Sequence, residues 1–420
     1  MEKLRLGLIG LGTVGSGVYK SAAEFDNIEI VKIAVKNITK PRSVEVPTEK
    51  LTDNPYDVVN DPSIDVVVEL MGGVEPAWDY IKTALENGKH IVTANKELLA
   101  KKGEELFNLS EKHNRVVLYE AAIAGGIPII MPIKTILAGN KIHKIQAILN
   151  GTTNYILTKM DVQGASYEDV LKEAQALGYA ETDPTGDVEG FDAAYKITTL
   201  STIAFNSRIK FENVYREGIT KIRSQDMHAA NDLGYKIKLI ASAYMDENGK
   251  ADVRVHPMLV SKCSTLAHID YVTNAVSLSG HPVGSITLSG PGAGEFPTAS
   301  SVVGDILAIA AEIGKSDYIL PMMRCKHSGN AEMLNINETI NKYYISINAK
   351  NNKGVIGKIG TICADNDISL ASIVQRCVSE DNTADITVIT ELVKEKNMRN
   401  AIKLIEKDGN KVNSIIRVQV

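Results

Sequence analysis

A glycine-rich turn near the start of the chain places the strongest constraint on its fold. The residues Gly10-Leu11-Gly12-Thr13-Val14-Gly15 have the spacing GxGxxG, and they lie between an apolar run and a helix-compatible stretch. A dinucleotide-binding fingerprint needs this context. Gly10 allows the tight turn, Gly12 lets the backbone approach a pyrophosphate, and Gly15 allows close helix–strand packing. The helix N-terminus favours phosphate charge. We therefore predict cofactor contacts at Gly10, Gly12, Thr13, Val14 and Gly15.

The region up to about residue 120 alternates short strands with helices. Five runs rich in Val and Ile are LRLGLIG, IEIVKIAV, IDVVVEL, HIVTAN and RVVLYE, and helix-period segments lie between several of them. Alternating strands and helices indicate βαβ units and a parallel sheet. Several strands are apolar on both faces, as expected where helices cover both sides. We predict an α/β protein with a Rossmann-type parallel sheet over residues 1–120.

Two further domains are expected after this sheet. Residues 121–325 contain helical segments, including 127–139 and 187–205, followed by strand-like runs, which indicates an α+β catalytic and dimerisation domain. Its final helix, at about 298–314, is expected to return to the Rossmann domain. After a polar linker, residues 342–420 have the order β-α-β-β-α-β of a ferredoxin-like unit.

Composition argues against several classes of partner. The chain has 46 Lys and Arg against 51 Asp and Glu, a formal net charge of −5, so nucleic-acid binding driven by bulk charge is not expected. It lacks a run of about 18 apolar residues, so no membrane span is expected. Its four cysteines have no CxxC spacing, which argues against a zinc site or disulfide framework and favours a reducing, cytoplasmic compartment.

The segment after the second predicted strand bears on cofactor choice. An NAD enzyme would place Asp or Glu about 20 residues after the glycines to hold the ribose hydroxyls. Residues 35–42 contain no acid but three cations, Lys36, Lys40 and Arg42. This pattern favours NADP over NAD, with Lys36 and Arg42 as phosphate contacts. The alternative is that these cations belong to a solvated loop.

Two other turns follow predicted strands. The stretch Thr93–Lys96 ends a strand, at the edge where ligands bind in open α/β sheets. By itself, Lys96 could equally be a surface lysine. The small-residue turn at 120–128 could direct backbone carbonyls at a hard monovalent cation, and the alternative is a tight strand-to-helix connection.

The densest group of polar residues runs from Tyr179 to Lys196. It contains five acids, and Asp192 and Lys196 are four residues apart, so they share one helix face. Carboxylates here would bind a substrate ammonium, and the lysine would exchange a proton with a hydroxyl or carbonyl oxygen. An acid-rich helix start with a surface ion pair is the alternative.

Taken together, these motifs resemble the homoserine dehydrogenase family along essentially the whole chain, with a C-terminal ACT domain. The matching stretches are GLGTVGSGV (10–18), TANKELLA (93–100), EAAIAGGIPII (120–130), ILNGTTNYIL (148–157), GYAETDPTGDVEGFDAAYK (178–196) and GPGAGEFPTASSVVGD (290–305). The resemblance implies the reversible NAD(P)-dependent interconversion of L-homoserine and L-aspartate 4-semialdehyde, a step toward threonine, methionine and isoleucine.

The resemblance also implies roles for single residues. Lys196 matches the family's general acid/base, and Lys96 matches a second lysine with a proton-transfer role. The substrate contacts implied are Glu181, Asp192, Asp187, Thr152 and Tyr179. Besides Lys36 and Arg42 of the cationic segment, cofactor contacts are expected at Thr93, Lys96 and Gly294. The backbone carbonyls expected to hold a sodium ion are those of Glu120, Ile123, Gly125 and Ile127.

In the reducing direction, NADPH would donate hydride to the aldehyde carbon and Lys196 would supply the proton.

The loop at 351–357 of the ACT domain is expected to bind an amino acid, threonine before isoleucine or methionine, unless the domain is only a dimerisation surface. Because the domain carries no catalytic motif, it is predicted to be dispensable for chemistry. ACT domains often pair edge to edge, which implies a homodimer or homotetramer.

Two rival functions remain open from the residues. One is a dehydrogenase of another hydroxy amino acid, which the set Glu181, Asp192 and Lys196 together with NGTTN argues against. The other is a non-catalytic sensor of dinucleotides and amino acids. Every polar position of the family motif is present, which argues against a degenerate site.

Overall fold

The structure is a computed structural model that describes residues 3–312, 325, 327, 329–378 and 382–420. The chain forms two compact units. The first unit comprises Met1–Leu149, Asp192–Val214 and Thr273–Ala331. The second comprises Asn150–Phe191, Tyr215–Val272 and Glu332–Val420. Each unit is described by itself.

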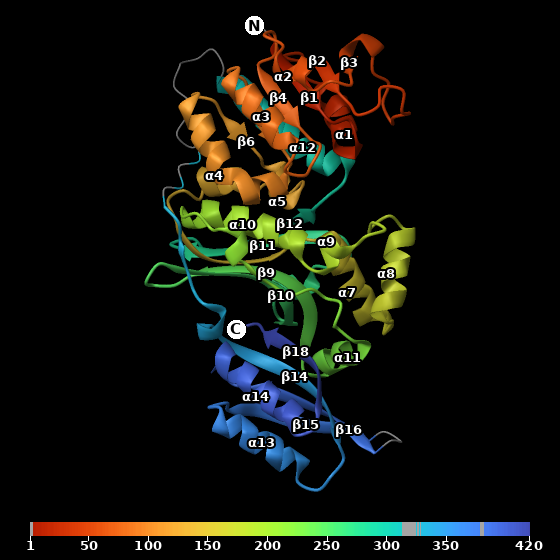
Figure 1. Cartoon of the computed structure of the whole chain (residues 1–420), viewed down its shortest axis with the longest axis vertical. Helices are drawn as coiled ribbons and strands as arrows, with labels where there is room; N and C mark the ends of the chain where they lie inside the picture. The colour runs from red at the N-terminus through yellow and green to blue at the C-terminus, as the bar shows by residue number, and fades with distance from the viewer. Residues whose placement is uncertain (1–2, 313–324, 326, 328, 379–381) are drawn as a thin grey trace. The chain divides into compact units, whose positions relative to one another are not determined.

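The first unit contains a six-stranded parallel sheet of order β3-β2-β1-β4-β5-β6 (Figure 1). Its strands are β1 (Leu4–Ile9), β2 (Ile28–Ala34), β3 (Leu51–Thr52), β4 (Val66–Glu69), β5 (His90–Thr93) and β6 (Val117–Leu118). The Rossmann-type sheet predicted from the sequence is confirmed, and β3 is the strand that the sequence did not reveal. The strand order reverses between β1 and β4, and ligands bind at the carboxyl ends of strands beside such a point.

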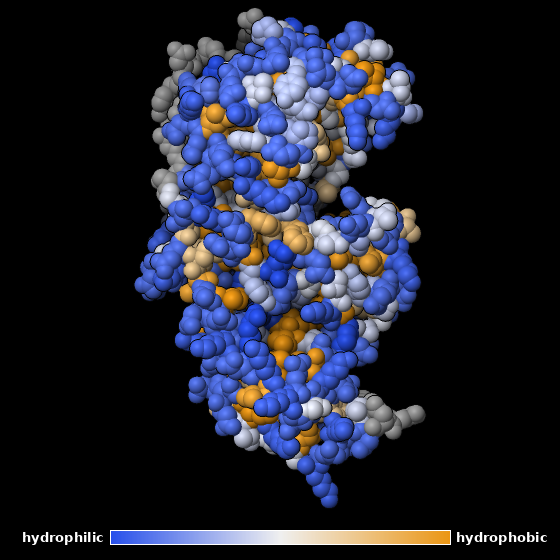
Figure 2. Space-filling model, viewed as in Figure 1, coloured by the Kyte–Doolittle hydropathy of each residue, from blue (hydrophilic) through white to orange (hydrophobic). Residues whose placement is uncertain are grey.

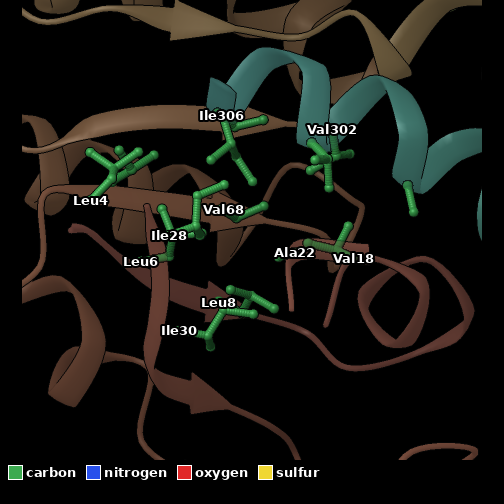
Figure 3. Packing of buried hydrophobic residues seen from close by; sticks show 14 of the residues in the cluster. Leu4, Leu6, Leu8, Val18, Ala22, Ile28, Ile30, Val68, Val302 and Ile306 are labelled. Carbon is green, nitrogen blue, oxygen red and sulfur yellow. The ribbon is translucent and has the colours of Figure 1, made fainter. Parts of the chain in front are cut away.

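Helices surround this sheet, and one of them comes from much later in the chain. The early ones are α1 (Thr13–Ala22), the 3₁₀ turn η1 (Thr48–Lys50), α2 (Tyr56–Val59), α3 (Ala77–Glu86) and α4 (Lys96–Lys112). The late one is α12 (Glu295–Glu312), which packs against α1. Its Val302 and Ile306 belong to the same buried cluster as Leu6 and Val68 (Figure 3). Gly17 permits this packing, since a Cβ there would lie 2.6 Å from the Glu295 carbonyl oxygen.

The rest of the first unit is a small antiparallel sheet with helices. The strands are β7 (Lys141–Ile148), β11 (Thr273–His281) and β12 (Gly284–Pro291), in the order β12-β11-β7. The helices are α5 (Ala121–Ala124), α6 (Ile130–Lys134), α10 (Phe191–Phe205) and the 3₁₀ turn η2 (Phe211–Asn213).

Two helical predictions needed correction. A long helix is expected over 127–139, but only α6 is helical in this range. The N–H groups at the start of α6 are held by a side chain from another segment, as described below. The helix expected over 187–205 is interrupted, because Gly190 has φ +79° and separates α9 (Thr185–Val188) from α10. The predicted last helix begins at Glu295, and residues 313–314 lie outside the described residues.

The first part of the second unit combines four helices and a 3₁₀ turn with two long strands. Its helices are α7 (Gly151–Gln163), α8 (Tyr167–Ala176), α9, α11 (Ser224–Asp232) and the 3₁₀ turn η3 (Thr265–His268). Strands β9 (Tyr235–Met245) and β10 (Lys250–Ser261) pair antiparallel, and β8 (Tyr215–Arg216) and β13 (Glu332–Met333) add to β10.

The C-terminal part of this unit has the predicted ferredoxin-like order. After the 3₁₀ turn η5 (Ile336–Glu338), its elements are β14 (Ile340–Lys350), α13 (Val355–Asp365), β15 (Leu370–Val378), β16 (Thr383–Thr390), β17 (Val393–Lys394), α14 (Glu395–Lys407) and β18 (Lys411–Val418). The sheet order β18-β14-β16-β15 is antiparallel, and the two helices share its apolar core with residues such as Ile347 and Ile386.

This C-terminal part is built into the second unit rather than appended to it. Strand β18 pairs in parallel with β10 through Met258 and Leu259. The Asp226 carboxylate is completely buried and accepts hydrogen bonds from the Tyr344 hydroxyl at 3.1 Å and the Ser414 hydroxyl at 2.7 Å. Removal of residues after 341 would expose the edge of β10 and leave Asp226 without these donors. The structure therefore argues against the prediction that this part is dispensable.

The surface agrees with the composition. Figure 2 shows a mainly hydrophilic face, on which apolar residues lie in separate small groups. Within the described residues, none of the helices is both long and apolar enough to cross a lipid bilayer.

A buried histidine at the start of β5 links stability to pH. The Nδ1 atom of His90 accepts a hydrogen bond from the Val116 N–H at 3.1 Å, so the ring is neutral when this bond forms. Burial lowers the pKa of His90 to about 4, and the nearby Arg115 charge acts in the same direction. An unfolded histidine titrates near its ordinary value of 6.5. The stability due to this ring is therefore complete above about pH 6.5 and is lost as the pH falls toward about 4.

We predict that His90→Gln makes the free energy of unfolding less dependent on pH in this window, because the variant has no ring to protonate. Urea unfolding of parent and variant between pH 6.5 and about 4 measures this. The control is His281→Gln, since His281 is exposed, and it should follow the parent. An unchanged pH dependence in His90→Gln would contradict the assignment.

Candidate active site

The glycine turn has the geometry of an anion-binding helix start. Gly10 has φ +105° and donates its N–H to the Ala34 carbonyl at 2.9 Å, which ties the turn to the end of β2. A Cβ on Gly15 would lie 2.5 Å from the Gly10 carbonyl oxygen, so close packing requires this glycine. Gly12, the N-cap of α1, has no atom within 4 Å of where its Cβ would be and makes no side-chain cap. Open space at an uncapped helix N-terminus suits a pyrophosphate group.

The cationic loop after β2 is organised by its own arginine. The Arg42 guanidinium donates to the Ile38 carbonyl at 2.9 Å, to the Lys40 carbonyl at 2.8 Å and to the Asn37 carbonyl. Lys36 is exposed. Both predicted phosphate contacts thus lie on the loop that follows the strand bonded to Gly10.

Glu69 at the end of β4 is an organising residue that the motif analysis missed. Its carboxylate is completely buried and accepts the Thr93 hydroxyl at 2.6 Å and the Met71 and Gly72 N–H groups at 2.8 and 3.2 Å. Burial raises the pKa of Glu69, although these hydrogen bonds act in the opposite direction. The sequence signal was present, because an acid that ends the apolar strand IDVVVEL needs a buried partner.

This network places the first residue of α4. The Thr93 hydroxyl accepts the Asn95 N–H at 3.0 Å. The Asn95 side chain in turn caps α4 by accepting the Leu98 N–H at 3.1 Å. Lys96 follows directly as the first residue of the helix. The hydroxyl of Thr93, a predicted cofactor contact, is therefore bound to Glu69, while Lys96 is held at the carboxyl end of β5.

The first unit brings together three of the predicted site residues, Lys96, Asp192 and Lys196. The Lys196 ammonium donates to Asp192 Oδ2 at 2.7 Å and to the Leu149 carbonyl at 2.7 Å. Lys96 forms an ion pair with the other oxygen, Asp192 Oδ1. Asp192 and Lys196 are 6% and 9% exposed, whereas the Lys96 side chain is 44% exposed.

The charges of this cluster leave a net positive group. One carboxylate lies between two ammonium groups, and Asp192 is in the first turn of α10, where the helix dipole favours a negative charge. Two fixed acceptors hold the Lys196 ammonium in one position. A buried ammonium held in this way can stabilise an oxyanion or pass a proton to it.

In the second unit, the NGTTN motif shapes the start of α7. The Asn150 side chain accepts the Thr153 N–H at 2.8 Å as N-cap and donates to Asp187 Oδ1 at 2.7 Å. A Cβ on Gly151 would lie 3.1 Å from the Val272 carbonyl oxygen. Asn154 is buried and donates to the Ile269 and Tyr271 carbonyls. The motif thus fixes a helix start and connects it to Asp187.

The other predicted substrate contacts lie near this helix start. The Thr152 hydroxyl donates to the Tyr179 carbonyl at 2.6 Å, and the rings of Tyr155 and Tyr179 are 4.9 Å apart. Gln175 donates to the Glu181 carbonyl at 3.1 Å, while the Glu181 side chain is exposed. The structure therefore groups Thr152 with Tyr179 and places Asp187 against the helix cap.

The turn predicted to hold sodium is stabilised by its first side chain. The Glu120 carboxylate accepts the N–H groups of Ile129, Ile130 and Met131, which start α6. Its own N–H donates to the buried Asp305 carboxyl at 2.8 Å, and burial raises the pKa of Asp305 to about 8. Glu120 is thereby committed to the chain through its side chain, which leaves backbone carbonyls as the cation ligands that this turn can offer.

This turn also meets the loop before α12. Gly125 has φ +60°, and a Cβ there would lie 2.3 Å from the Gly292 carbonyl oxygen. Gly126 donates its N–H to the Pro291 carbonyl at 3.1 Å, and the Ser301 hydroxyl donates to the Gly125 carbonyl at 2.6 Å. Gly294, a predicted cofactor contact, has φ +122° and immediately precedes α12. Among the described residues, no group of three or more His, Cys, Asp or Glu side chains could hold a metal ion.

Comparison with known proteins supports one family throughout the chain. Residues 10–120 match the family model described as homoserine dehydrogenase, NAD binding domain. Residues 128–307 match the model for homoserine dehydrogenase, and residues 343–410 match the ACT domain.

Individual relatives cover nearly the whole chain. A homoserine dehydrogenase from Synechocystis sp. is 41% identical over 99% of this chain and 99% of its own length. The crystal structure of a homoserine dehydrogenase from Thiobacillus denitrificans is 40% identical, with a TM-score of 0.93 over 100% of this chain and 99% of that one. A hyperthermophilic archaeal homoserine dehydrogenase in complex with NADPH is 27% identical, with a TM-score of 0.63 over 74% of this chain and 99% of that one. The chain belongs to the homoserine dehydrogenase family.

Proposed function

We propose that the chain performs its family's reaction with Lys196 as the general acid and base. The family carries homoserine dehydrogenase activity, which interconverts L-homoserine and L-aspartate 4-semialdehyde with NAD(P). The observation that supports Lys196 is its buried ammonium, which is fixed by Asp192 and the Leu149 carbonyl. In the reducing direction, a bound nicotinamide cofactor would supply the hydride, and Lys196 delivers a proton to the developing alkoxide.

The neighbouring residues of the cluster have separate roles in this proposal. Asp192 orients Lys196 and also holds Lys96, so one carboxylate sets the position of two ammonium groups. Lys96 is the more exposed of the two and adds positive charge beside the reacting oxygen. A proton transfer positioned in this way typically contributes 10²–10⁴-fold to the rate, as an order of magnitude.

We propose that residues of the second unit bind the substrate's polar groups. Glu181 offers an exposed carboxylate suited to an ammonium group. Asp187 and Thr152 are held by the Asn150 cap and the Tyr179 carbonyl, which supports a fixed arrangement of their oxygens. Tyr179 is the fourth residue of the second unit that we propose as a substrate contact.

The glycine turn and the cationic loop support NADP as the preferred cofactor. Gly10, Gly12, Thr13, Val14 and Gly15 would hold the pyrophosphate, and Lys36 and Arg42 would bind the 2′-phosphate. Residues 35–42 carry no acid that would repel this phosphate. The archaeal relative was solved with NADPH, which supports the same choice. Thr93, Lys96 and Gly294 complete the proposed cofactor set.

A sodium ion is a further part of the proposal. Its ligands would be the backbone carbonyls of Glu120, Ile123, Gly125 and Ile127. The Gly125 carbonyl accepts one hydrogen bond from Ser301 and has a second lone pair for a cation. A bound ion would hold the turn against the 290–294 loop and supply no redox chemistry.

The remaining proposals concern organisation and control. A division into 1–120, 121–325 and 342–420 is supported by the three family models matched.

The ACT match supports an amino-acid effector, with threonine at the 351–357 loop as our proposal. The edge strand β15 supports pairing into a homodimer or homotetramer. We propose a reducing cytoplasmic location, because the four cysteines have no CxxC spacing.

We predict that Lys196→Ala lowers turnover by roughly 10²–10⁴-fold, because the proton donor is lost. NADPH binding, measured by fluorescence titration, should stay within about twofold, since the lysine is remote from the phosphate turn in sequence. Added ethylammonium should restore part of the turnover. Lys102→Ala is the control, because Lys102 lies on the same helix as Lys96 and forms an exposed ion pair with Glu105. Turnover of Lys196→Ala within a few-fold of the parent would contradict the role.

We predict that Arg42→Ala raises the KM for NADPH roughly tenfold or more, because a charged hydrogen bond to the phosphate is lost. The KM for NADH should change little, since NADH has no 2′-phosphate. Lys32→Ala on the preceding strand β2 is the control, as Lys32 pairs with Asp61. Steady-state kinetics with both cofactors measure the difference, and equal effects on the two would contradict the assignment.

A further inference from the structure

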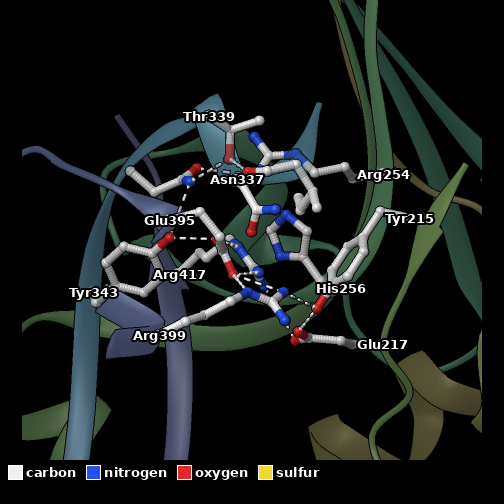
Figure 4. A network of polar contacts seen from close by, with 12 residues as sticks. Tyr215, Glu217, Arg254, His256, Asn337, Thr339, Tyr343, Glu395, Arg399 and Arg417 are labelled. Carbon is white, nitrogen blue, oxygen red and sulfur yellow. Dashed lines mark hydrogen bonds and ion pairs between the residues drawn. The ribbon is translucent and has the colours of Figure 1, made fainter. Parts of the chain in front are cut away.

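A buried ionic cluster in the second unit is not used by the chemistry proposed above. Arg417 on β18 donates to both oxygens of Glu395, at 2.8 and 3.2 Å, and to Glu217 Oε2 at 3.1 Å (Figure 4). Arg417 and Glu395 are almost fully buried, with side chains 4% and 5% exposed, and Tyr343 also donates to Glu395. Glu217 is the exception, because its side chain is 36% exposed.

Glu217 lies in a short segment, residues 215–220, that is held from the C-terminal side. The Tyr215 hydroxyl donates to Glu217 and accepts a bond from Arg399 at 3.1 Å. The Glu217 N–H donates to the Val255 carbonyl on β10 at 2.8 Å. Side chains from α14 and β18 thus fix one side of this segment.

The opposite side of the segment touches residues 188–191, which directly follow Asp187, a proposed substrate contact. The Ile219 N–H donates to the Val188 carbonyl at 2.8 Å, and the Thr220 hydroxyl donates to Glu189 at 3.1 Å. The Arg216 guanidinium lies 3.6 Å from the ring centre of Phe191, the first residue of α10. Residues 216, 219 and 220 therefore each contact the segment 188–191.

Gly218 packs closely against the backbone of Val188 and Glu189. A Cβ on Gly218 would lie 2.3 Å from the Val188 carbonyl oxygen and 2.7 Å from the Glu189 Cα. Backbone atoms are thus in direct contact, and a displacement of residue 217 or 218 must displace Val188. Asp187 precedes Val188 and holds the Asn150 cap of α7, so the displacement reaches the start of that helix.

We propose that Glu217 is a positioning residue for homoserine binding. Arg417 of the C-terminal strand holds Glu217, and Glu217 sets the position of residues 187–191 through Gly218 and Ile219. This inference rests on the proposed role of Asp187 in substrate binding. It also gives the C-terminal part a physical connection to the substrate side, because the anchoring arginine belongs to its last strand.

The test uses the full chain and two variants. Glu217→Gln keeps an acceptor for Tyr215 but loses the charged contact with Arg417. Gly218→Ala keeps the ion pair but inserts a methyl group against Val188. We expect the KM for homoserine to rise roughly tenfold in both, within the usual range of coupling between linked sites. The KM for NADP should stay within about twofold, because the glycine turn is untouched.

Glu338→Gln is the matched control, since Glu338 forms an exposed ion pair with Lys394 in the same unit. It should leave both KM values unchanged. A merely structural role for Glu217 would reduce the active fraction and therefore kcat, with no change in the KM for homoserine. A homoserine KM within twofold of the parent in both variants would overturn the proposal. A parent protein inactive with homoserine and NADP would instead overturn the proposed function.

Discussion

The carboxylate of Asp192, bound by two lysines, is the interaction on which the proposed chemistry depends. Each carboxylate oxygen faces a different ammonium group, that of Lys96 or that of Lys196. Burial makes such a contact strong and makes the loss of one partner costly. The two lysines come from helices almost 100 residues apart in the chain, so this one carboxylate joins the parallel sheet to α10.

Other buried polar groups hold the elements that carry the site. Glu69 binds Thr93, whose hydroxyl in turn accepts a bond from Asn95, the cap that begins α4 before Lys96. In the second unit Asn150 caps α7 and binds Asp187. In this account Glu69, Asn95 and Asn150 act on orientation rather than on the substrate. They explain why the TANKELLA and NGTTN motifs contain asparagine, whose side chain both accepts and donates.

Much of the fold could be predicted from the sequence because its signals are local. Alternating apolar runs and helices indicated the Rossmann sheet, and the i,i+4 spacing placed Asp192 beside Lys196. The short strand β3 has only two residues, and the break at Gly190 depends on one left-handed glycine, so neither left a periodic signal. The contacts of Glu120 with Asp305 and of Glu217 with Arg417 join residues about 200 positions apart. Nothing in a single sequence indicates which distant residue a buried charge will meet.

A double-mutant cycle over Lys96 and Asp192 tests the central claim most directly. The variants are Lys96→Met, Asp192→Asn and their combination, each with Lys196 intact, and the quantity measured is kcat/KM for homoserine. If the carboxylate and the two lysines act as one unit, the double variant will be no slower than the slower single variant, which is a strong positive coupling. Losses that multiply in the double variant would show that Lys96 and Asp192 act independently and would contradict the account.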